Sequence, residues 1–179
     1  MIRRITICIA AFAAVACMST SPDRSGANRG RDGNDTQGRA REAAFSRPPY
    51  PQDSDLMEFS VGEAGSHRYF IDTKSVSVGT DGIVRYTVVV KAAGGATNVL
   101  FEGIRCDPAQ KRIYAFGRTG GQWIEAKRAA WTPIRLNRLD DYQTALYEDG
   151  FCPERSLVRT REEALFALRS RFRGRPSTK

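Results

Sequence analysis

Histidine is almost absent from the sequence, and its scarcity excludes several kinds of site. The only histidine is His67, and no Ser–His–Asp or Cys–His arrangement can be argued from its spacing to other residues. It lies beside an expected turn, so we interpret it as a solvated or hydrogen-bonded residue rather than an acid–base group. Two cysteines, Cys106 and Cys152, with one distant histidine do not have the ligand spacing of a zinc site. We therefore expect neither a metal nor a cofactor.

The sequence also lacks a phosphate-binding loop, internal repeats of useful length and coiled-coil heptads. Arg118–Trp123 is rich in glycine but does not have the GxxxxGK[ST] spacing, and no helix is expected after it. We interpret this stretch as a hairpin turn. Trp123 and Trp131 are interpreted as core or rim aromatics rather than as a platform for stacking sugars.

The apolar run Ile5–Ala16 is too short to span a bilayer as a helix. It follows the basic pair Arg3-Arg4, and this order is typical of a secretory signal peptide. We assign residues 1–16 to this signal and predict that the protein is exported.

Ala14-Val15-Ala16-Cys17 resembles a bacterial lipobox, in which the cysteine becomes the lipidated first residue. A lipid on Cys17 would anchor the chain to a membrane, and by resemblance to lipoprotein sorting Met18 favours the outer membrane. Ordinary cleavage nearby is the alternative, because the small residues before Cys17 also form a signal-peptidase site. We expect a periplasmic location in both cases.

The cysteines fit an exported protein. Cys8 leaves with the signal and Cys17 carries the lipid, so Cys106 and Cys152 remain. In an oxidising compartment these two are expected to form a disulfide, with two free thiols as the alternative. Closing the loop between them would contribute roughly 4 kcal/mol to stability on the chain-entropy model.

Composition predicts one folded domain between polar tails. The chain has 179 residues, 41% of them hydrophobic, with 16 glycines and 8 prolines, which suits a turn-rich β protein. Residues 17–49 are polar and lack apolar periodicity, so we expect a disordered linker there. We assign 50–173 to a single domain and 174–179 to a basic tail.

The net charge of +8 is concentrated near the C-terminus. One interpretation is contact with anionic lipid headgroups, and the alternative is a solvated basic surface. Nucleic acid is not an expected partner, because the protein is predicted to be exported. The basic residues concerned are Arg155, Arg159, Arg161, Arg169, Arg171, Arg173, Arg175 and Lys179.

Three antiparallel strands are expected at the centre of the domain, joined by turns at Gly94-Gly95 and Asp107–Gln110. They are Ile83–Lys91, Asn98–Cys106 and Lys111–Arg118, and further strands are expected at Leu56–Val61, His67–Asp72, Ser75–Val78 and Trp123–Ala126. Helices are expected at Asp140–Tyr147, with Asp140 as N-cap, and from Thr160 to about Arg173. The predicted fold is α+β, a curved antiparallel sheet of about six or seven strands with C-terminal helices packed on one face.

The turns predict a register and two candidate sites. If Gly94-Gly95 is a two-residue turn, Tyr86 faces Gly103, and Arg85 lies diagonally from Glu102. An unpaired ionised carboxylate would be costly in the sheet, so Glu102 is expected to pair with Arg85 or to have a raised pKa. Arg105, expected opposite Arg112 at the sheet rim, is a candidate for anion binding, with a solvated edge as the alternative.

Several short motifs, taken in order, resemble the cryptic neisserial protein 1-like family of bacterial envelope proteins. The resemblance covers roughly Tyr50 to Cys152 and implies an envelope location, but supplies no activity and no catalytic residues. The motifs are Pro51, Phe59, Tyr69–Asp72, Asp81–Tyr86, Glu102–Cys106, Tyr114–Gly117, Trp123 and Cys152-Pro153.

These observations favour a non-catalytic binding or structural module, a lipoprotein at the periplasmic side of the outer membrane. An envelope-polymer hydrolase or lyase that uses Glu102 is the alternative, since a buried carboxyl with a raised pKa is one form of general acid. A structural role for Glu102 is favoured, because buried carboxyls also occur without catalysis. An anionic envelope lipid or another protein is the expected partner, and the oligomeric state is not indicated.

Overall fold

The described part of the chain belongs to one compact unit, Ala40–Lys179. The computed structural model describes residues 42–62, 66–138 and 141–172. Several expectations lie outside these residues: the signal segment 1–16, Cys17, the linker up to residue 41, and the basic tail 174–179.

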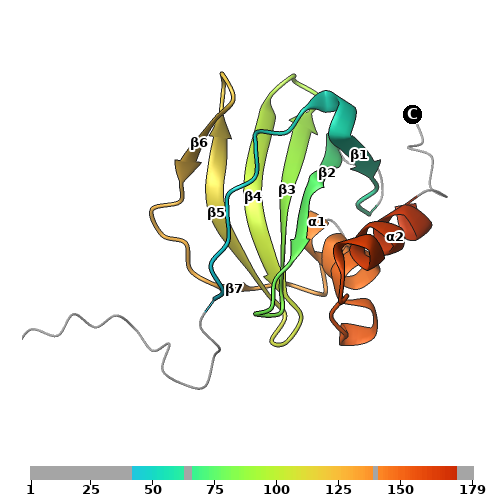
Figure 1. Ribbon diagram of the computed structural model, residues 1–179. Coiled ribbons are helices and arrows are strands. Elements are labelled where there is room, and N and C mark those ends of the chain that lie inside the picture. Colours follow the sequence, from blue (N-terminus) through green and yellow to red (C-terminus); the bar gives the residue numbers. More distant parts are fainter. Residues whose placement is uncertain (1–41, 63–65, 139–140, 173–179) are drawn as a thin grey trace, which may run out of the picture. The chain divides into compact units, whose positions relative to one another are not determined.

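Seven strands in the described residues form one open antiparallel sheet (Figure 1). From β1 to β6 the order in the sheet follows the order in the chain, and β7 pairs with β5. The expected α+β fold, with six or seven antiparallel strands and C-terminal helices, is therefore confirmed. The strands are β1 (Leu56–Phe59), β2 (His67–Val78), β3 (Ile83–Ala92), β4 (Thr97–Arg105), β5 (Gln110–Arg118), β6 (Gln122–Glu125) and β7 (Thr132–Pro133).

Strand β2 joins two segments that were expected to be separate strands. Its pairing with β3 shifts between Asp72 and Ser77. At this irregularity the Ser75 hydroxyl accepts a hydrogen bond from the Thr87 backbone N–H at 2.7 Å and donates to the Asp72 carbonyl at 2.8 Å. The side chain of Ser75 therefore supplies the bonds that the ladder loses there, and the strand continues.

All helical segments except η1 (Asp53–Asp55) follow the sheet in the chain. The expected N-cap of the first C-terminal helix, Asp140, is wrong. The Asp141 side chain caps this helix, because it accepts a hydrogen bond from the Gln143 N–H. One bond of the predicted capping box is present, since the Glu163 N–H donates to Thr160 Oγ1 at 3.1 Å. The Glu163 carboxylate accepts from the Arg159 N–H at 2.7 Å. The helical segments are the short η1 (Asp53–Asp55), α1 (Tyr142–Ala145), the π-helix η2 (Leu146–Phe151), the short η3 (Pro153–Arg155) and α2 (Arg161–Phe172).

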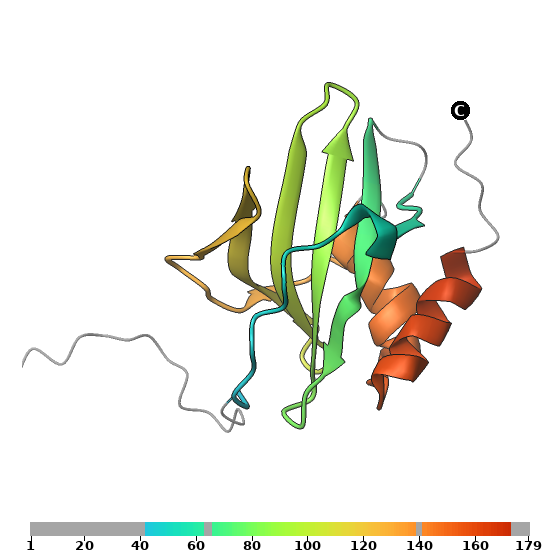
Figure 2. The same cartoon turned by 45° about the horizontal axis from the view of Figure 1, so that its top comes forward.

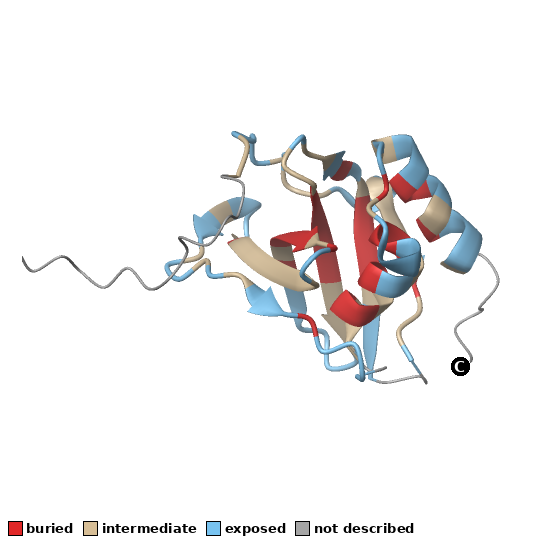
Figure 3. Ribbon diagram, turned by 90° about the horizontal axis from the view of Figure 1, so that it is seen from below, coloured by how far each residue is buried: buried red, intermediate tan, exposed pale blue. Residues whose placement is uncertain are grey.

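One face of the sheet packs against the helices and forms the larger core. The rings of Tyr86 and Phe151 lie 5.0 Å apart, and Figure 3 shows buried residues on the facing sides of sheet and helices. Burying each large apolar side chain contributes about 1.5–3 kcal/mol. Other members are Ile71, Val84, Val88, Ile104, Leu146, Leu165 and Leu168.

The disulfide between Cys106 and Cys152 is present, and their Cα atoms lie 5.5 Å apart. It ties the end of β4 to the residue that follows η2. The Tyr147 hydroxyl strengthens the same junction by donating to the Cys106 carbonyl at 3.0 Å. The helices that reach β4 are therefore α1 and η2. Helix α2, the second of the expected C-terminal helices, packs against η2, β1 and β2.

Residues 42–51, named here the N-terminal strap, cross the opposite face of the sheet (Figures 1 and 2). The Phe45 ring lies 5.9 Å from that of Phe101. Strands β3 and β4 are thus covered on both sides, which explains why all of Ile83–Val89 is buried. The folded domain was expected to begin at residue 50. The structure places residues 42–49 in it as well.

The far end of the strap packs near β5 and β6. Tyr50 lies 5.4 Å from Trp123 between ring centroids, and Trp123 Nε1 donates to the Pro48 carbonyl at 3.1 Å. A Cβ on Gly117 would lie 2.8 Å from the Tyr50 ring, so only glycine allows this close approach. Polar composition could not reveal these contacts, because they depend on a few apolar residues separated by polar ones.

The predicted register between β3 and β4 is wrong by one residue. Tyr86 pairs with Glu102, and Arg85 pairs with Gly103. The loop contains three residues rather than two, because Ala92 pairs with Ala96 through an Ala92 N–H bond of 2.9 Å. A shift of one residue moves each side chain to the other face. Arg85 and Glu102 therefore point to opposite sides of the sheet, and the expected ion pair between them does not form.

The predicted register between β4 and β5 is also wrong, and a bulge divides the observed ladder. Phe101 pairs with Ala115, but the next residue, Glu102, pairs with Ile113. The residue left over is Tyr114, whose ring lies against Gly103, as a Cβ placed there would come within 2.9 Å of it. Tyr114 therefore covers Gly103, although the two residues are not paired.

Candidate functional site

Glu102 lies in the middle of β4 and is fully buried on the helix side. Its Oε2 accepts a hydrogen bond from the Tyr86 hydroxyl at 2.9 Å. Its Oε1 accepts from the Tyr142 hydroxyl at 2.7 Å and from Gln143 Nε2 at 3.3 Å. The cap at Asp141 begins α1 where its first two side chains reach the carboxyl. Glu102 is therefore enclosed by three neutral donors.

Burial raises the pKa of the Glu102 carboxyl above its ordinary value of 4.5, while hydrogen bonds from Tyr142 and Tyr86 oppose this rise. The direction agrees with the expected raised pKa. Burial, followed by the nearby Glu102 charge, also raises the pKa of both tyrosines well above 10.0. Both hydroxyls thus remain donors at neutral pH.

Two surface cavities lie near this cluster, and Glu102 lines neither. The larger, of about 610 Å³, is bordered by Lys111, Arg135, Arg138 and Asp141. The smaller, of about 370 Å³, is bordered by apolar and aromatic residues and by Tyr142. Tyr142 thus separates Glu102 from the smaller cavity. A substrate in either cavity would not touch the carboxyl.

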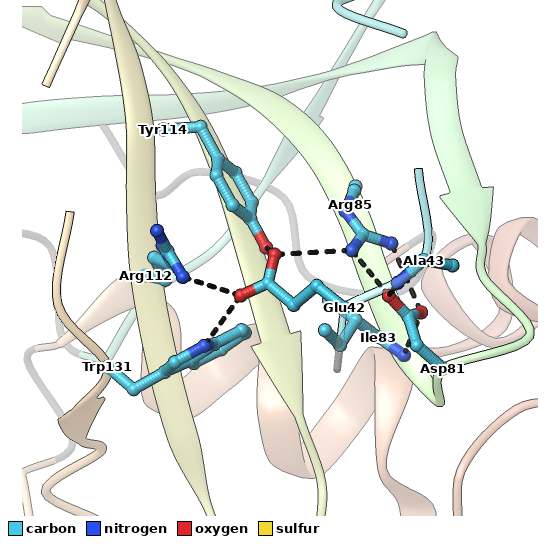
Figure 4. A network of polar contacts seen from close by, with 8 residues as sticks. All are labelled: Glu42, Ala43, Asp81, Ile83, Arg85, Arg112, Tyr114 and Trp131. Carbon is cyan, nitrogen blue, oxygen red and sulfur yellow. Dashed lines mark hydrogen bonds and ion pairs between the residues drawn. The ribbon is translucent and has the colours of Figure 1, made fainter. Parts of the chain in front are cut away.

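A second polar cluster lies on the strap side of the sheet and is built around Glu42 (Figure 4). Glu42 Oε1 accepts from Arg112 Nη1 at 2.6 Å and from Trp131 Nε1 at 2.8 Å. Glu42 Oε2 accepts from the Tyr114 hydroxyl at 3.1 Å and lies 3.5 Å from Arg85 Nη2. Four donors from three separate parts of the domain thus surround one carboxylate.

Arg85 joins this cluster to Asp81. The Arg85 guanidinium is 2% exposed and donates to both Asp81 oxygens, at 2.6 and 3.2 Å. Asp81 also accepts the backbone N–H bonds of Ala43, at 2.8 Å, and Ile83, at 3.2 Å. Burial acts to raise the pKa of Asp81, but the bonds from Arg85 and Ala43 outweigh it and hold the pKa below its ordinary value. Asp81 therefore fixes both the arginine and the strap backbone.

Aromatic rings form the walls of the Glu42 cluster. The Phe45 ring lies 4.7 Å from that of Tyr114, and the Arg85 guanidinium lies over Phe45 at 4.3 Å. On the other side, the Arg105 guanidinium lies 3.8 Å from the Trp131 ring centre. Cation–π contacts of this kind contribute about 0.5–2 kcal/mol and hold the charged groups in place.

The Glu42 cluster has the chemistry of a carboxylate-binding site. Arg85 and Arg112 carry two positive charges against the two negative charges of Asp81 and Glu42. Without Glu42, two arginines would face one carboxylate. Bonds between arginine and carboxylate are charge-assisted and roughly twice as strong as neutral ones. The cluster is therefore equipped to bind a carboxylate.

The predicted arginine pair is only partly reproduced. Arg105 pairs with Gln110, and Arg112 pairs with Gly103, so the two arginines do not face each other across the ladder. Both nevertheless reach the same cluster, Arg112 through Glu42 and Arg105 through Trp131. The loop between the two strands explains the difference, because it spans Cys106–Ala109, one residue earlier than expected, and this moves the pairing at this end by two residues.

Glu42 itself was not predicted as a site residue. It falls in the stretch interpreted as linker, and its nearest partners in the sequence are 43 residues away at Arg85 and 70 away at Arg112. The only local signal is the spacing of one acidic and one aromatic residue, Glu42 and Phe45. That spacing is too common to indicate a site.

His67 is exposed, as expected, and its Nδ1 lies 3.3 Å from Ser66 Oγ. Among the residues that the structure describes, no group of three or more His, Cys, Asp or Glu side chains is placed to hold a metal ion. Within the same ranges no helix has the length and apolar character needed to cross a bilayer.

The basic residues of α2 make contacts within the domain. Arg161 Nη2 donates to the Thr73 carbonyl at 2.9 Å, and Arg171 Nε lies 3.5 Å from an Asp149 oxygen. Arg169 is exposed. The described part of the basic C-terminus thus attaches α2 to the rest of the domain, which is compatible with a solvated basic surface.

An open antiparallel sheet, covered by disulfide-linked helices on one face and by an N-terminal strap on the other, defines the class of domain. The chain belongs to the CNP1-like family, whose match covers residues 35–169. The match begins before the strap and so includes Glu42 and Phe45. No curated protein and no solved structure matches the chain.

Proposed function

We propose that this member of the CNP1-like family is an exported cell-envelope lipoprotein. A lipid on Cys17 would anchor it to the periplasmic side of the outer membrane. Its domain would act as a non-catalytic binding or structural module.

The observation that carries this proposal is the disulfide between Cys106 and Cys152. Stable structural disulfides are formed in oxidising compartments such as the bacterial periplasm. The other two cysteines, Cys8 and Cys17, lie in the apolar N-terminal run and at the end of the lipobox-like motif. Signal cleavage and lipidation would therefore leave no free cysteine thiol in the mature protein.

The environment of Glu102 supports the non-catalytic role. Its carboxyl is 0% exposed, and three donors from the domain itself already bind its oxygens. A general acid must come within hydrogen-bond reach of the group that it protonates. Glu102 could do so only if α1 moved and removed Tyr142. The hydrolase or lyase alternative requires that movement.

Labelling with radioactive palmitate tests the anchor. The wild-type chain expressed in a bacterial host should incorporate label, and Cys17→Ala should not. Cys8→Ala is the matched control and should label like the wild type, because that cysteine lies in the segment that is removed. Equal labelling of Cys17→Ala would show that the chain is not anchored through this residue.

The catalytic alternative is tested with purified peptidoglycan as the envelope polymer. We expect wild-type protein and Glu102→Gln to release the same background quantity of soluble fragments. Folding of the variant is checked by circular dichroism. Release by the wild type that is lost in folded Glu102→Gln would establish the enzyme and reject the binding module.

A further inference from the structure

Glu42 and Phe45 occupy the strap side of the sheet as a peptide ligand would. They belong to an extended segment without strand pairing. The domain binds this segment at three places: the Glu42 carboxylate, the Ala43 N–H and the Phe45 ring. The carboxylate of Glu42 is bound by Arg112, Trp131 and Tyr114. The side chains that bind it come from the sheet and from the connection between β6 and β7, none of them from the strap.

The ring of Phe45 fills a second subsite. It lies 5.9 Å from Phe101, 4.7 Å from Tyr114 and 4.3 Å from the Arg85 guanidinium. Even so it remains 42% exposed, so it lies at the surface rather than inside the core. Between the two subsites, the Ala43 N–H donates to Asp81 at 2.8 Å.

The resident carboxylate does not satisfy every donor of the cluster. Arg85 Nε and Arg112 Nε are buried and have no hydrogen-bond partner among the described residues. A site that is specific only for its own strap would be expected to leave fewer buried donors without an acceptor.

We propose that this surface is a recognition site for an acidic peptide segment of another polypeptide, one that presents a carboxylate and, three residues later, an aromatic ring. Glu42 and Phe45 are its resident ligand in cis. A partner segment of the same chemistry displaces residues 42–45, which releases the strap at its N-terminal end. The site is separate from the lipid anchor and does not depend on it.

A full-length Glu42→Ala/Phe45→Ala variant opens the site and leaves the remainder of the strap, including Pro48 and Tyr50, unchanged. The probe is the acetylated and amidated tetrapeptide Glu-Ala-Ala-Phe. Binding is followed through the indole N–H resonance of Trp131, which bonds to Glu42 in the native chain. The chain has only two tryptophans, so this signal can be assigned by substituting one of them.

We expect a saturable shift of the Trp131 resonance in the open variant. The peptide Gln-Ala-Ala-Phe should bind at least tenfold more weakly, because it lacks the charge that the arginines bind. The wild-type chain should also bind Glu-Ala-Ala-Phe at least tenfold more weakly. Its own strap competes at an effective concentration in the millimolar range.

Two further variants locate the binding. Arg112→Gln in the open background should abolish the preference for Glu-Ala-Ala-Phe over Gln-Ala-Ala-Phe. Arg118→Gln, on the same strand but outside the cluster, is the control and should preserve it. Absence of a saturable shift, or equal affinity for the two peptides, would overturn the proposal.

Circular dichroism shows whether the open variant is folded. If it is not, Glu42→Ala alone keeps the Phe45 ring in place and is titrated with N-acetylglutamate amide. A shift of the Trp131 indole resonance with N-acetylglutamate amide, but not with N-acetylglutamine amide, would support the site. Equal responses to the two compounds would reject it. An anchor failure in the palmitate experiment would leave both outcomes unaffected.

Discussion

Glu102 illustrates how a single carboxyl can be accommodated in a sheet without a contacting cation. Tyr86 on the neighbouring strand and Tyr142 and Gln143 on α1 donate to it, while burial raises its pKa. The cluster connects β3, β4 and α1, so it fixes how the first helix packs on the sheet. We interpret its role as structural and expect its removal to lower the free energy of unfolding.

The first prediction concerns substitution of this residue. Glu102→Ala should lower the free energy of unfolding by about 3 kcal/mol or more, because it leaves several buried donors without an acceptor. Glu102→Gln keeps the shape and one acceptor oxygen and should cost about 1 kcal/mol. Urea denaturation measures both. Equal values for the two variants would contradict the role assigned to the donors.

The second prediction concerns pH. The folded state holds the Glu102 proton more tightly than the unfolded chain, because its folded pKa is above the ordinary 4.5. The stability that this group contributes is fully present below its unfolded pKa and is lost as pH rises through the folded pKa. The unfolding free energy of the wild type minus that of Glu102→Gln should therefore decrease as pH rises above 4.5. An increase with pH would mean that the folded pKa is lowered.

At the scale of elements, the loop between β3 and β4 decides the faces of the sheet. Gly95 has a φ of +85°, whereas no positive φ occurs at Gly94. A two-residue turn of the kind expected from a Gly-Gly pair would place both glycines at positive φ. The observed loop, with Ala93 added, requires this conformation at only one of them.

The third prediction follows from this difference. Gly95→Ala should lower stability by about 1–2 kcal/mol, because alanine is disfavoured at positive φ. Gly94→Ala is the matched control and should change stability by less than about 0.5 kcal/mol. Neither new Cβ would meet an atom within 4 Å, so packing does not confuse the comparison. Equal losses, measured by thermal denaturation, would support the two-residue turn instead.

The fourth prediction tests the contact between η2 and α2. A Cβ on Gly150 would lie 2.6 Å from Leu168 Cδ2, and Leu168 is fully buried. Gly150→Ala should therefore destabilise the domain by about 1–3 kcal/mol. Combining it with Leu168→Ala should cost less than the sum of the two single changes, because the contact is then removed. Additive losses in urea denaturation would show that the two elements do not touch there.

At the scale of the whole molecule, the disulfide links two parts of the core that lie 46 residues apart in the sequence. The fifth prediction is that reduction lowers the unfolding free energy by about 4 kcal/mol, the chain-entropy value for a loop of this length. Urea denaturation with and without dithiothreitol measures the change. The Cys106→Ala/Cys152→Ala variant is the control, and reductant should not affect it. A wild type that is equally insensitive would contradict the disulfide.

The sequence by itself determined the local structure of this protein. Dense β-branched segments predict the strands, and the spacing of Thr160 and Glu163 predicts the start of α2. The pairing of Cys106 with Cys152 followed from counting cysteines once export was predicted. These features depend on residues close in the chain or on chemistry that needs no geometry, so sequence patterns are sufficient for them.

Only the tertiary structure decided which side chains meet. The choice between two and three loop residues moved Arg85 away from Glu102 and toward Glu42. Glycine permits either loop, so local preference cannot select one, and the packing of both faces makes the selection. Glu42 could not be predicted as a site residue for a similar reason. Its partners lie far away in the chain and come together only when the strap lies across the sheet.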